Sequence, residues 1–306
     1  MTFEHVPVLF NKVIDSLNIK ANGTYMDGTV GGAGHSSGIC ERLSDDGHLV
    51  AVDRDSVALE TAMERLSKFS CKKTFIHANY SDVDKIRTEI GKVDGILLDL
   101  GVSSYQLDTA ERGFSYMHDA PMDMRMNEDD MFTAATVVNE YSEAELFRII
   151  KEYGEERWAS RIAKFIVKAR DEKYIETTGQ LVDIIKAAIP ASARRTGPHP
   201  AKRTFQAIRI EVNQELEALQ ELLVQSCRIL RKGGRLVVIS YHSLEDRLVK
   251  MFLKYQMFEG EPERDIYGNY EKKFELPYRK AIVPTEEEIE DNSRARSAKM
   301  RVGIKL

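Results

Sequence analysis

The sequence lacks the features that stabilise small secreted domains or anchor a chain in a membrane. Its three cysteines, Cys40, Cys71 and Cys227, are odd in number, widely spaced and form no CxxC pair. This pattern argues against a disulfide framework and against a zinc site. No apolar run approaches the roughly 20 residues of a membrane-spanning helix, and Met1–Lys20 lacks the basic start and apolar stretch of a signal peptide. We therefore expect a cytoplasmic protein with no bound metal.

The sequence also lacks an excess of positive charge, since its 306 residues carry a net charge of −5. The basic residues nevertheless gather in two windows that contain no acid, Ala191–Ile210 and Asn292–Leu306. A protein of negative total charge can present a basic patch, and a polyanion binds the patch. On charge alone, two solvated surface stretches are an equally good interpretation.

Strand-like apolar runs alternate with helical patterns through the first hundred residues, and two more strand-like runs occur near the end of the chain. Such alternation is typical of a parallel sheet that helices cover on both faces. We predict an α/β fold with a doubly wound, mostly parallel sheet. The expected strands are Tyr25–Val30, His48–Val52, Lys73–Ala78, Gly95–Leu98, Leu236–Ser240 and Met300–Ile304, and the expected early helices are His35–Leu43, Ser56–Phe69 and Val83–Ile90.

The alternation stops after Gly101, and from about Phe132 to Ile189 the pattern is helical throughout. Pro190 ends this helical stretch, and a long helix over Phe205–Leu230 leads back to the strands. We predict an all-helical domain, residues 113–202, inserted into a core formed by residues 1–112 and 203–306. The expected helices of the insertion are Ala144–Tyr153, Arg157–Ala169 and Thr178–Ile189.

A glycine-rich turn, Asp27–His35 (DGTVGGAGH), lies between the first predicted strand and the helix after it. Glycines let the backbone approach a ligand closely, and amides at a helix start suit an anion or a polar cofactor. Nicotinamide, flavin, nucleotide and S-adenosylmethionine sites all use such loops. In the dinucleotide fingerprint G-x-G-x-x-G, Gly32 and Gly34 match the first two glycines, but Ser37 stands at the third. The loop is not followed by the G-K-[ST] sequence that a phosphate-binding loop requires. A tight turn without a ligand is the alternative.

Two acids end predicted strands. Asp53 follows the second strand, 19 residues after Gly34, where a carboxylate can accept both hydroxyls of a ribose. The alternative role for Asp53 is the N-cap of the next helix, which Asp55 or Ser56 could also provide. Asp99 follows four apolar residues of the fourth strand, a position that favours binding or catalysis over a solvated turn.

These features resemble a class I, Rossmann-like methyltransferase that uses S-adenosylmethionine. Longer motifs extend the resemblance along the whole chain. They are similar to the bacterial family that methylates cytosine N4 in small-subunit ribosomal RNA. The motifs are Asp99–Gln106 (DLGVSSYQ), Ala110–Met124 (AERGFSYMHDAPMDM), Tyr153–Arg157 (YGEER), His199–Asn213 (HPAKRTFQAIRIEVN), Ile239–Arg247 (ISYHSLEDR) and Asn292–Ala298 (NSRARSA).

The resemblance implies a set of cofactor contacts. Loop amides would face the methionine end, Asp53 the ribose and Asp99 the ammonium, while Tyr80 would pack beside the adenine. The contacts fall on Ala33, Gly34, His35, Asp53, Tyr80, Asp99 and Gln106.

The residues that act on the base are harder to assign. Many amino-methyltransferases carry [DNS]-P-P-[YFW] after the fourth strand, whereas this chain has Asp99-Leu100-Gly101-Val102. Tyr241 or Phe114 could stack on an extruded base, with a core position as the alternative for each. Ser104 and Ser243 are further candidates for the base pocket. The catalytic candidates are Asp99, Ser103, Tyr241 and His242.

The resemblance implies that the partner is small-subunit ribosomal RNA or the small ribosomal subunit, and it leaves a homo-oligomer open. The helical insertion would supply shape-based recognition of RNA. The alternatives are a methyltransferase for another RNA site or a small molecule, a nicotinamide oxidoreductase, and a non-catalytic assembly factor. The expected RNA-binding residues are Arg194, Arg195, Lys202, Arg203, Arg294, Arg296 and Arg301.

Overall fold

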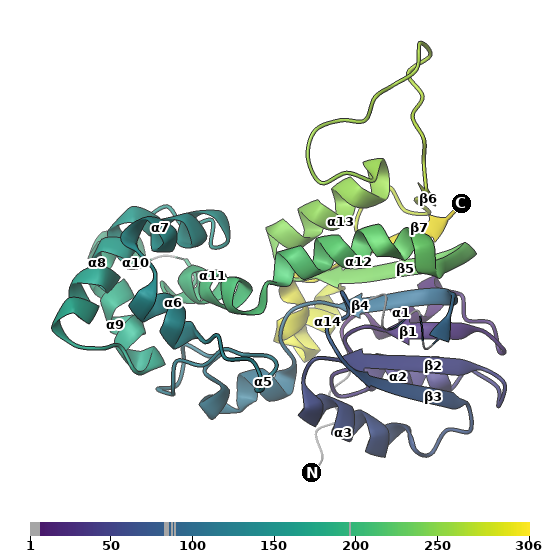
Figure 1. Cartoon of the computed structure of the whole chain (residues 1–306), viewed down its shortest axis with the longest axis horizontal. Coiled ribbons are helices and arrows are strands. Elements are labelled where there is room, and N and C mark those ends of the chain that lie inside the picture. The colour runs from purple at the N-terminus through teal and green to yellow at the C-terminus, as the bar shows by residue number, and fades with distance from the viewer. Residues whose placement is uncertain (1–6, 83–85, 87, 89, 196) are drawn as a thin grey trace. The chain divides into compact units, whose positions relative to one another are not determined.

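The computed structural model describes residues 7–82, 86, 88, 90–195 and 197–306. The chain forms two compact units, Met1–Gly101 with Leu216–Leu306, and Val102–Glu215. We call them the sheet unit and the helical unit (Figure 1).

The sheet unit is built on seven strands in the order β3-β2-β1-β4-β5-β7-β6 (Figure 1). Strands β1 to β5 run parallel to one another. Strand β7 pairs antiparallel with both β5 and β6. The strands are β1 Thr24–Asp27, β2 His48–Asp53, β3 Lys72–His77, β4 Val93–Asp99, β5 Leu230–Ser240, β6 Phe274–Glu275 and β7 Lys299–Lys305.

Alternate residues of the central strands enter two different apolar cores. In β2, Leu49 and Ala51 pack with the helices of one face, while Val50 and Val52 join the core of the other face. Apolar burial on both faces is what a doubly wound parallel sheet requires, so the predicted fold class is confirmed. The helices of this unit are α1 Phe10–Leu17, α2 Gly34–Cys40, α3 Ser56–Leu66, α12 Glu215–Ile229, α13 Ser243–Tyr255, α14 Glu286–Asp291 and the 3-10 helix η2 Ser293–Ser297.

The helical unit has a core of its own. Met124, Ile149, Ile162 and Ile185 are completely buried in it. Its helices are α5 Ser104–Asp108, the 3-10 helix η1 Ala110–Arg112, α6 Ala134–Glu140, α7 Glu143–Glu152, α8 Ala159–Glu172, α9 Thr178–Ala188, α10 Ala191–Arg194 and α11 Lys202–Asn213.

The helical unit spans Val102–Glu215, whereas the sequence-based insertion spans residues 113–202. Phe205, Ile208 and Val212 of α11 belong to the helical core, so the helical unit continues to Glu215. At its other end the unit begins at Val102, because α5 and η1 pack together.

The single long helix expected over Phe205–Leu230 is wrong. Gln214 adopts a left-handed conformation (φ 49°) and ends α11, and α12 starts at the next residue. Apolar side chains keep a helical period through the break, so the pattern alone did not reveal it. The first strand is also shorter than expected, since Gly28–Val30 already belong to the loop. The helix expected at Val83–Ile90 lies largely outside the described residues.

In the part of the chain that the structure describes, no helix combines the length and the apolar character that crossing a membrane requires.

Candidate functional site

The carboxyl ends of β1, β2 and β4 each carry an aspartate, and the glycine-rich loop follows the first of them. Asp27 ends β1 and is almost completely buried. Its Oδ2 accepts a hydrogen bond from the Ser36 hydroxyl (2.7 Å), and its Oδ1 accepts from the Thr29 amide (3.2 Å). Burial raises the pKa of Asp27, and the hydrogen bond from Ser36 opposes that rise. Asp27 therefore ties the start of the loop to helix α2.

Asp27 was not among the sequence-based candidates, although it has the same signal as Asp53 and Asp99, an acid directly after a buried strand.

The backbone of the loop depends on two glycines. Gly31 has a φ of +46°, a conformation that side chains rarely adopt. At Gly34 a Cβ atom would lie 2.3 Å from Cγ of Pro7. A larger residue at this position would therefore push the glycine loop away from Pro7. Gly34 and His35 are the first residues of α2, and their amides therefore have no acceptor within the helix. The loop thus offers backbone donors at the position where the sequence predicts a cofactor.

Asp53 at the end of β2 is half-buried and connects this strand to the loop. Its Oδ2 accepts from the Gly31 amide (2.9 Å) and its Oδ1 from the Asp55 amide (3.0 Å). The cap of α3 is Asp55, whose carboxylate accepts from the Val57 amide (3.1 Å). Asp53 is therefore not the helix cap. Burial raises the pKa of Asp53 to about 6, and the amide bonds from Asp55 and Gly31 limit the rise.

Asp99 at the end of β4 is held from three directions. The Tyr241 hydroxyl donates to its Oδ1 (2.7 Å), and its own amide donates to the Thr29 hydroxyl (2.7 Å). Its Oδ2 lies 3.6 Å from Nδ1 of His35. Burial, together with the Asp99 charge, raises the pKa of Tyr241 far above its ordinary value, so the hydroxyl stays protonated and donates.

His35 is buried, and its Nε2 lies 3.0 Å from the Val8 carbonyl oxygen. Burial lowers the pKa of His35, which favours the neutral ring. Nε2 then carries the proton that bonds Val8, and Nδ1 is an acceptor beside Asp99. An acceptor nitrogen next to a carboxylate oxygen suits a ligand that donates several hydrogens, such as an ammonium group.

Tyr80 lies beside the glycine loop. A Cβ atom at Gly28 would lie 3.1 Å from Cβ of Tyr80. The ring is half-buried against the core that contains Ile76 and Leu98. An aromatic residue next to the loop is consistent with the predicted adenine contact, which stays a prediction.

Ser103 and Gln106 belong to the helical unit, where they cap α5. The Ser103 hydroxyl accepts from the Gln106 amide (3.2 Å), and the Gln106 side-chain oxygen accepts from the Ser103 amide (3.1 Å). This capping box fixes the start of the helix that follows β4. The catalytic role of Ser103 and the cofactor contact of Gln106 stay predictions.

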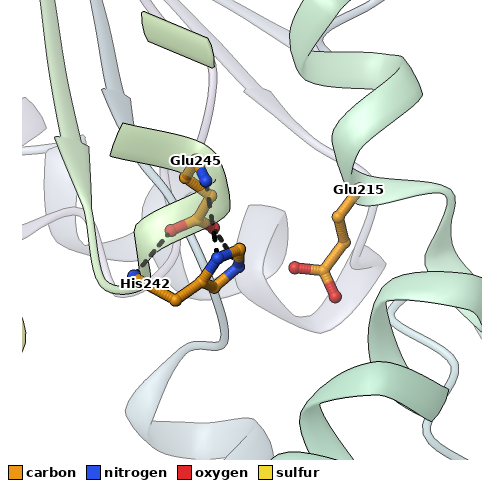
Figure 2. Close-up of side chains that lie close together, drawn as sticks. All are labelled: Glu215, His242 and Glu245. Atoms are coloured by element: carbon orange, nitrogen blue, oxygen red, sulfur yellow. Dashed lines mark hydrogen bonds and ion pairs between the residues drawn. The ribbon is translucent and has the colours of Figure 1, made fainter. Parts of the chain in front are cut away.

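His242 is the N-cap of α13, and both nitrogens of its ring face Glu245 (Figure 2). Nδ1 accepts from the Glu245 amide (3.4 Å), and Nε2 lies 3.2 Å from Glu245 Oε1. Glu245 Oε2 also accepts from the amides of Tyr241 (2.8 Å) and His242 (3.2 Å). The Glu245 carboxylate therefore orders the turn that carries Tyr241, and a catalytic role for His242 stays a prediction. Glu215, also labelled in Figure 2, belongs to the helical unit and pairs there with Arg209 (2.7 Å).

The seven basic residues of the two windows differ in their surroundings. Arg301 donates to Asp246 through Nε (2.6 Å) and Nη2 (3.2 Å), so its charge is compensated within the fold. A phosphate would have to compete with this ion pair. The other six are exposed, namely Arg194, Arg195, Lys202 and Arg203 of the helical unit and Arg294 and Arg296 of η2.

The sheet-unit residues fit an S-adenosylmethionine molecule by their chemistry. Asp53 can accept from hydroxyls, the Asp99–His35 pair from an ammonium, and the first amides of α2 can donate to a carboxylate. Such a site, at the carboxyl edge of a doubly wound sheet, is the arrangement expected of a class I methyltransferase that depends on S-adenosylmethionine.

The comparison with known proteins specifies the family. The chain belongs to the MraW methylase family, whose model matches residues 2–306.

Two curated relatives are similar to the chain over its full length. The ribosomal RNA small subunit methyltransferase H of Clostridioides difficile is 52% identical and that of Heliobacterium mobile 50%, each with 100% of both chains covered. Among solved structures, a putative rRNA methylase from Clostridium thermocellum matches 99% of this chain and 100% of its own, at 12% identity and a TM-score of 0.48.

The raised pKa of Asp53 predicts a pH-dependent change of stability. The folded state holds the Asp53 proton more tightly than the unfolded state, because the pKa rises from 3.8 to about 6 on folding. Asp53 therefore contributes stability below pH 4 that is lost as the pH rises through 6. In Asp53→Asn this loss is absent. The free energy of unfolding of the variant minus that of the wild type should therefore increase by about 1–2 kcal/mol from pH 4 to pH 8. This range is smaller than the full pKa shift implies, because Asp53 is partly exposed and solvent screens its charge.

Urea unfolding of both proteins without cofactor at pH 4 and pH 8 measures this change. The substitution also alters the hydrogen bonds to the Gly31 and Asp55 amides, but this effect is the same at both pH values and cancels in the comparison. A difference that does not change with pH would contradict the pKa assignment.

Proposed function

We propose that this protein transfers a methyl group from S-adenosylmethionine to the exocyclic N4 of a cytidine in 16S ribosomal RNA. The observation that carries the proposal is the identity of 50–52%, over whole chains, with proteins named ribosomal RNA small subunit methyltransferase H. The site geometry supports it, because acceptors and backbone donors lie where the sequence predicts the cofactor. The exposed basic residues of both windows support a polyanionic substrate.

The proposed cofactor site consists mainly of sheet-unit residues. The amides of Gly34 and His35 and the Asp99 carboxylate would hold the methionine end, Asp53 would hold the ribose, and Tyr80 would pack on the adenine. Ala33 shapes the turn with its left-handed backbone (φ 59°). The cofactor contact of Gln106 stays a prediction.

When bound, S-adenosylmethionine supplies a methyl group already activated by its sulfonium. The protein's contribution is then to align the displacement and to orient the acceptor nitrogen. The Tyr241 hydroxyl fixes the Asp99 carboxylate, and the Thr29 hydroxyl fixes the Asp99 backbone. Because cytosine N4 is a weak nucleophile, acceptors for its hydrogens favour the rehybridised nitrogen. We propose that Asp99, Tyr241 and His242 line the base pocket, and the catalytic role of Ser103 stays a prediction.

Transfer of labelled methyl from S-adenosylmethionine to small ribosomal subunits that lack the modification tests the proposal. Digestion to nucleosides should place the label on N4 of cytidine. Label on another atom, or on large-subunit RNA, would refute the proposed specificity and leave the methyltransferase class.

Tyr241→Phe should weaken cofactor binding and lower the free energy of unfolding moderately. The variant keeps the buried ring but removes the hydrogen bond to Asp99, so the carboxylate loses its orientation. A hydrogen bond to a charged group contributes about 1.5–3 kcal/mol to folding, and the lost orientation of Asp99 should raise the cofactor Kd by about 10-fold at most. Isothermal titration of the purified variant with S-adenosylmethionine measures the change.

Tyr25→Phe is the matched control for Tyr241→Phe. The Tyr25 hydroxyl accepts from the Lys20 amide (2.8 Å) near the start of β1, away from the carboxyl edge of the sheet. Tyr25→Phe should lower the melting temperature and leave cofactor affinity unchanged. Equal cofactor affinities of wild type and Tyr241→Phe would rule out the positioning role.

A further inference from the structure

Helix α8 of the helical unit has one apolar and one basic face. Ile162, Ala163 and Ile166 are completely buried in the helical core. On the opposite side, cations recur at intervals of three and four residues, which places them along one face. We call this set of exposed cations the basic stripe, and it consists of Arg157, in the turn before α8, and Arg161, Lys164 and Lys168.

Acids flank the basic stripe at both ends but do not interrupt it. The sequence has no acid between Glu156 and Asp171. Within the described residues, no stripe side chain forms an ion pair or a hydrogen bond. Other arginines of the same unit are paired, as Arg148 is with Glu211 (3.2 Å). Like charges at this spacing destabilise a helix, so an unpaired row of four favours a role outside folding.

Two of the four cations are held by aromatic rings. The Arg157 guanidinium lies 5.2 Å from the centre of the Trp158 ring, and that of Arg161 lies 5.3 Å from the Phe165 ring. Such stacking restricts a guanidinium while its N–H groups remain able to bind a phosphate in bidentate fashion.

The stripe also continues into the first basic window. The Arg203 guanidinium donates to the Glu155 carbonyl oxygen (3.0 Å), so the start of α11 lies against the segment just before Arg157. Lys202 and Arg203 are both exposed there. The Arg203 cation therefore lies beside the Arg157 end of the stripe.

We propose that the basic stripe binds the sugar-phosphate backbone of the RNA substrate. The inference rests on the proposed function and adds α8 to the residues expected to bind RNA. From Arg157 to Lys168 the stripe is about 16 Å long, enough to follow several phosphates of one strand. Its contacts would position the RNA without reading its sequence. An anionic membrane is less suitable, because the aromatics of this face, Trp158 and Phe165, are half-buried and lie against Arg157 and Arg161.

The test is the triple variant Arg161→Ala, Lys164→Ala and Lys168→Ala in the full-length protein. Alanine favours helices, so α8 should remain folded. Binding to a 16S ribosomal RNA transcript is measured over a range of salt concentrations. The Kd should rise about ten-fold or more near physiological salt, and the slope of log K against log salt should fall by about 2 to 3. Cofactor affinity should not change.

The matched control removes the same charge from exposed lysines of the sheet unit, Lys12, Lys92 and Lys232. It should bind RNA as the wild type does. A stripe variant that binds RNA like the wild type, equal weakening in both triple variants, or stronger binding of the wild type to anionic vesicles than to RNA would overturn the inference. Absence of N4-methylcytidine with the wild type would instead refute the proposed function, so the two failures can be told apart.

Discussion

Asp99→Ala is expected to lower methyl transfer at least about 100-fold and to raise the cofactor Kd about 10- to 100-fold. The variant removes the proposed acceptor for the ammonium, a charged hydrogen bond that contributes about 1.5–3 kcal/mol. It also leaves the buried Tyr241 hydroxyl without its acceptor, at a cost of about 1–3 kcal/mol of folding free energy. Calorimetric titration with S-adenosylmethionine and urea unfolding measure the two effects separately.

Two further variants separate charge from structure. Asp99→Asn retains an oxygen for the Tyr241 hydroxyl, so stability should be close to that of the wild type while cofactor affinity falls. Asp94→Ala removes an acid from the other end of the same strand, where it accepts from the Thr24 amide (3.0 Å) and Arg231 (2.6 Å). It should lose stability and keep cofactor affinity. Wild-type cofactor affinity in Asp99→Ala would eliminate Asp99 from the site.

The strand-end acids could be located from the sequence because their signal is local. A buried parallel strand is a continuous apolar run, and the first acid after it lies at the ligand-binding edge of the sheet. Asp53 and Asp99 were found in this way. The structure adds that Asp27 has the same position, and that Asp55 rather than Asp53 caps the following helix.

Pairs of side chains that are distant in sequence could not be predicted. Tyr241 meets Asp99 because β4 and β5 are adjacent and Asp99 pairs in register with Ile239, two residues before Tyr241. Likewise, the sequence around Arg301 contains no acid and did not reveal that Arg301 pairs with Asp246, which lies 55 residues earlier in the chain. Composition describes which charges are near one another along the chain, whereas ion pairs depend on the tertiary fold.

The break in the helix expected over Phe205–Leu230 was missed for a related reason. The end of α11 is set by one backbone conformation, the left-handed Gln214, and glutamine has no marked preference for it. The apolar pattern continues across the break.

Asn213→Ala is expected to cause the largest loss of stability in the helical unit, about 3–5 kcal/mol. Asn213 is almost completely buried at the end of α11. Its side-chain oxygen accepts from the Met126 amide (2.8 Å), and its amide group donates to the carbonyl oxygens of Met124 (2.8 Å) and Arg209 (2.9 Å). Alanine would leave buried backbone groups without partners, in a segment where Met124 has a φ of +60°. Urea unfolding measures the loss.

The loss should be confined to the helical unit, because the bonds of Asn213 to Met124, Met126 and Arg209 lie within Val102–Glu215. Hydrogen exchange should therefore accelerate in α6, α7 and α11, while the strands of the sheet unit stay protected. Cofactor affinity should change less than about three-fold, whereas methyl transfer to ribosomal RNA should fall with the folded fraction of the helical unit. Gln214→Ala, at the exposed left-handed residue that follows Asn213, is the control and should cost under about 0.5 kcal/mol. Unchanged exchange in α11 of Asn213→Ala would mean that Asn213 does not hold the segment around Met124 in place.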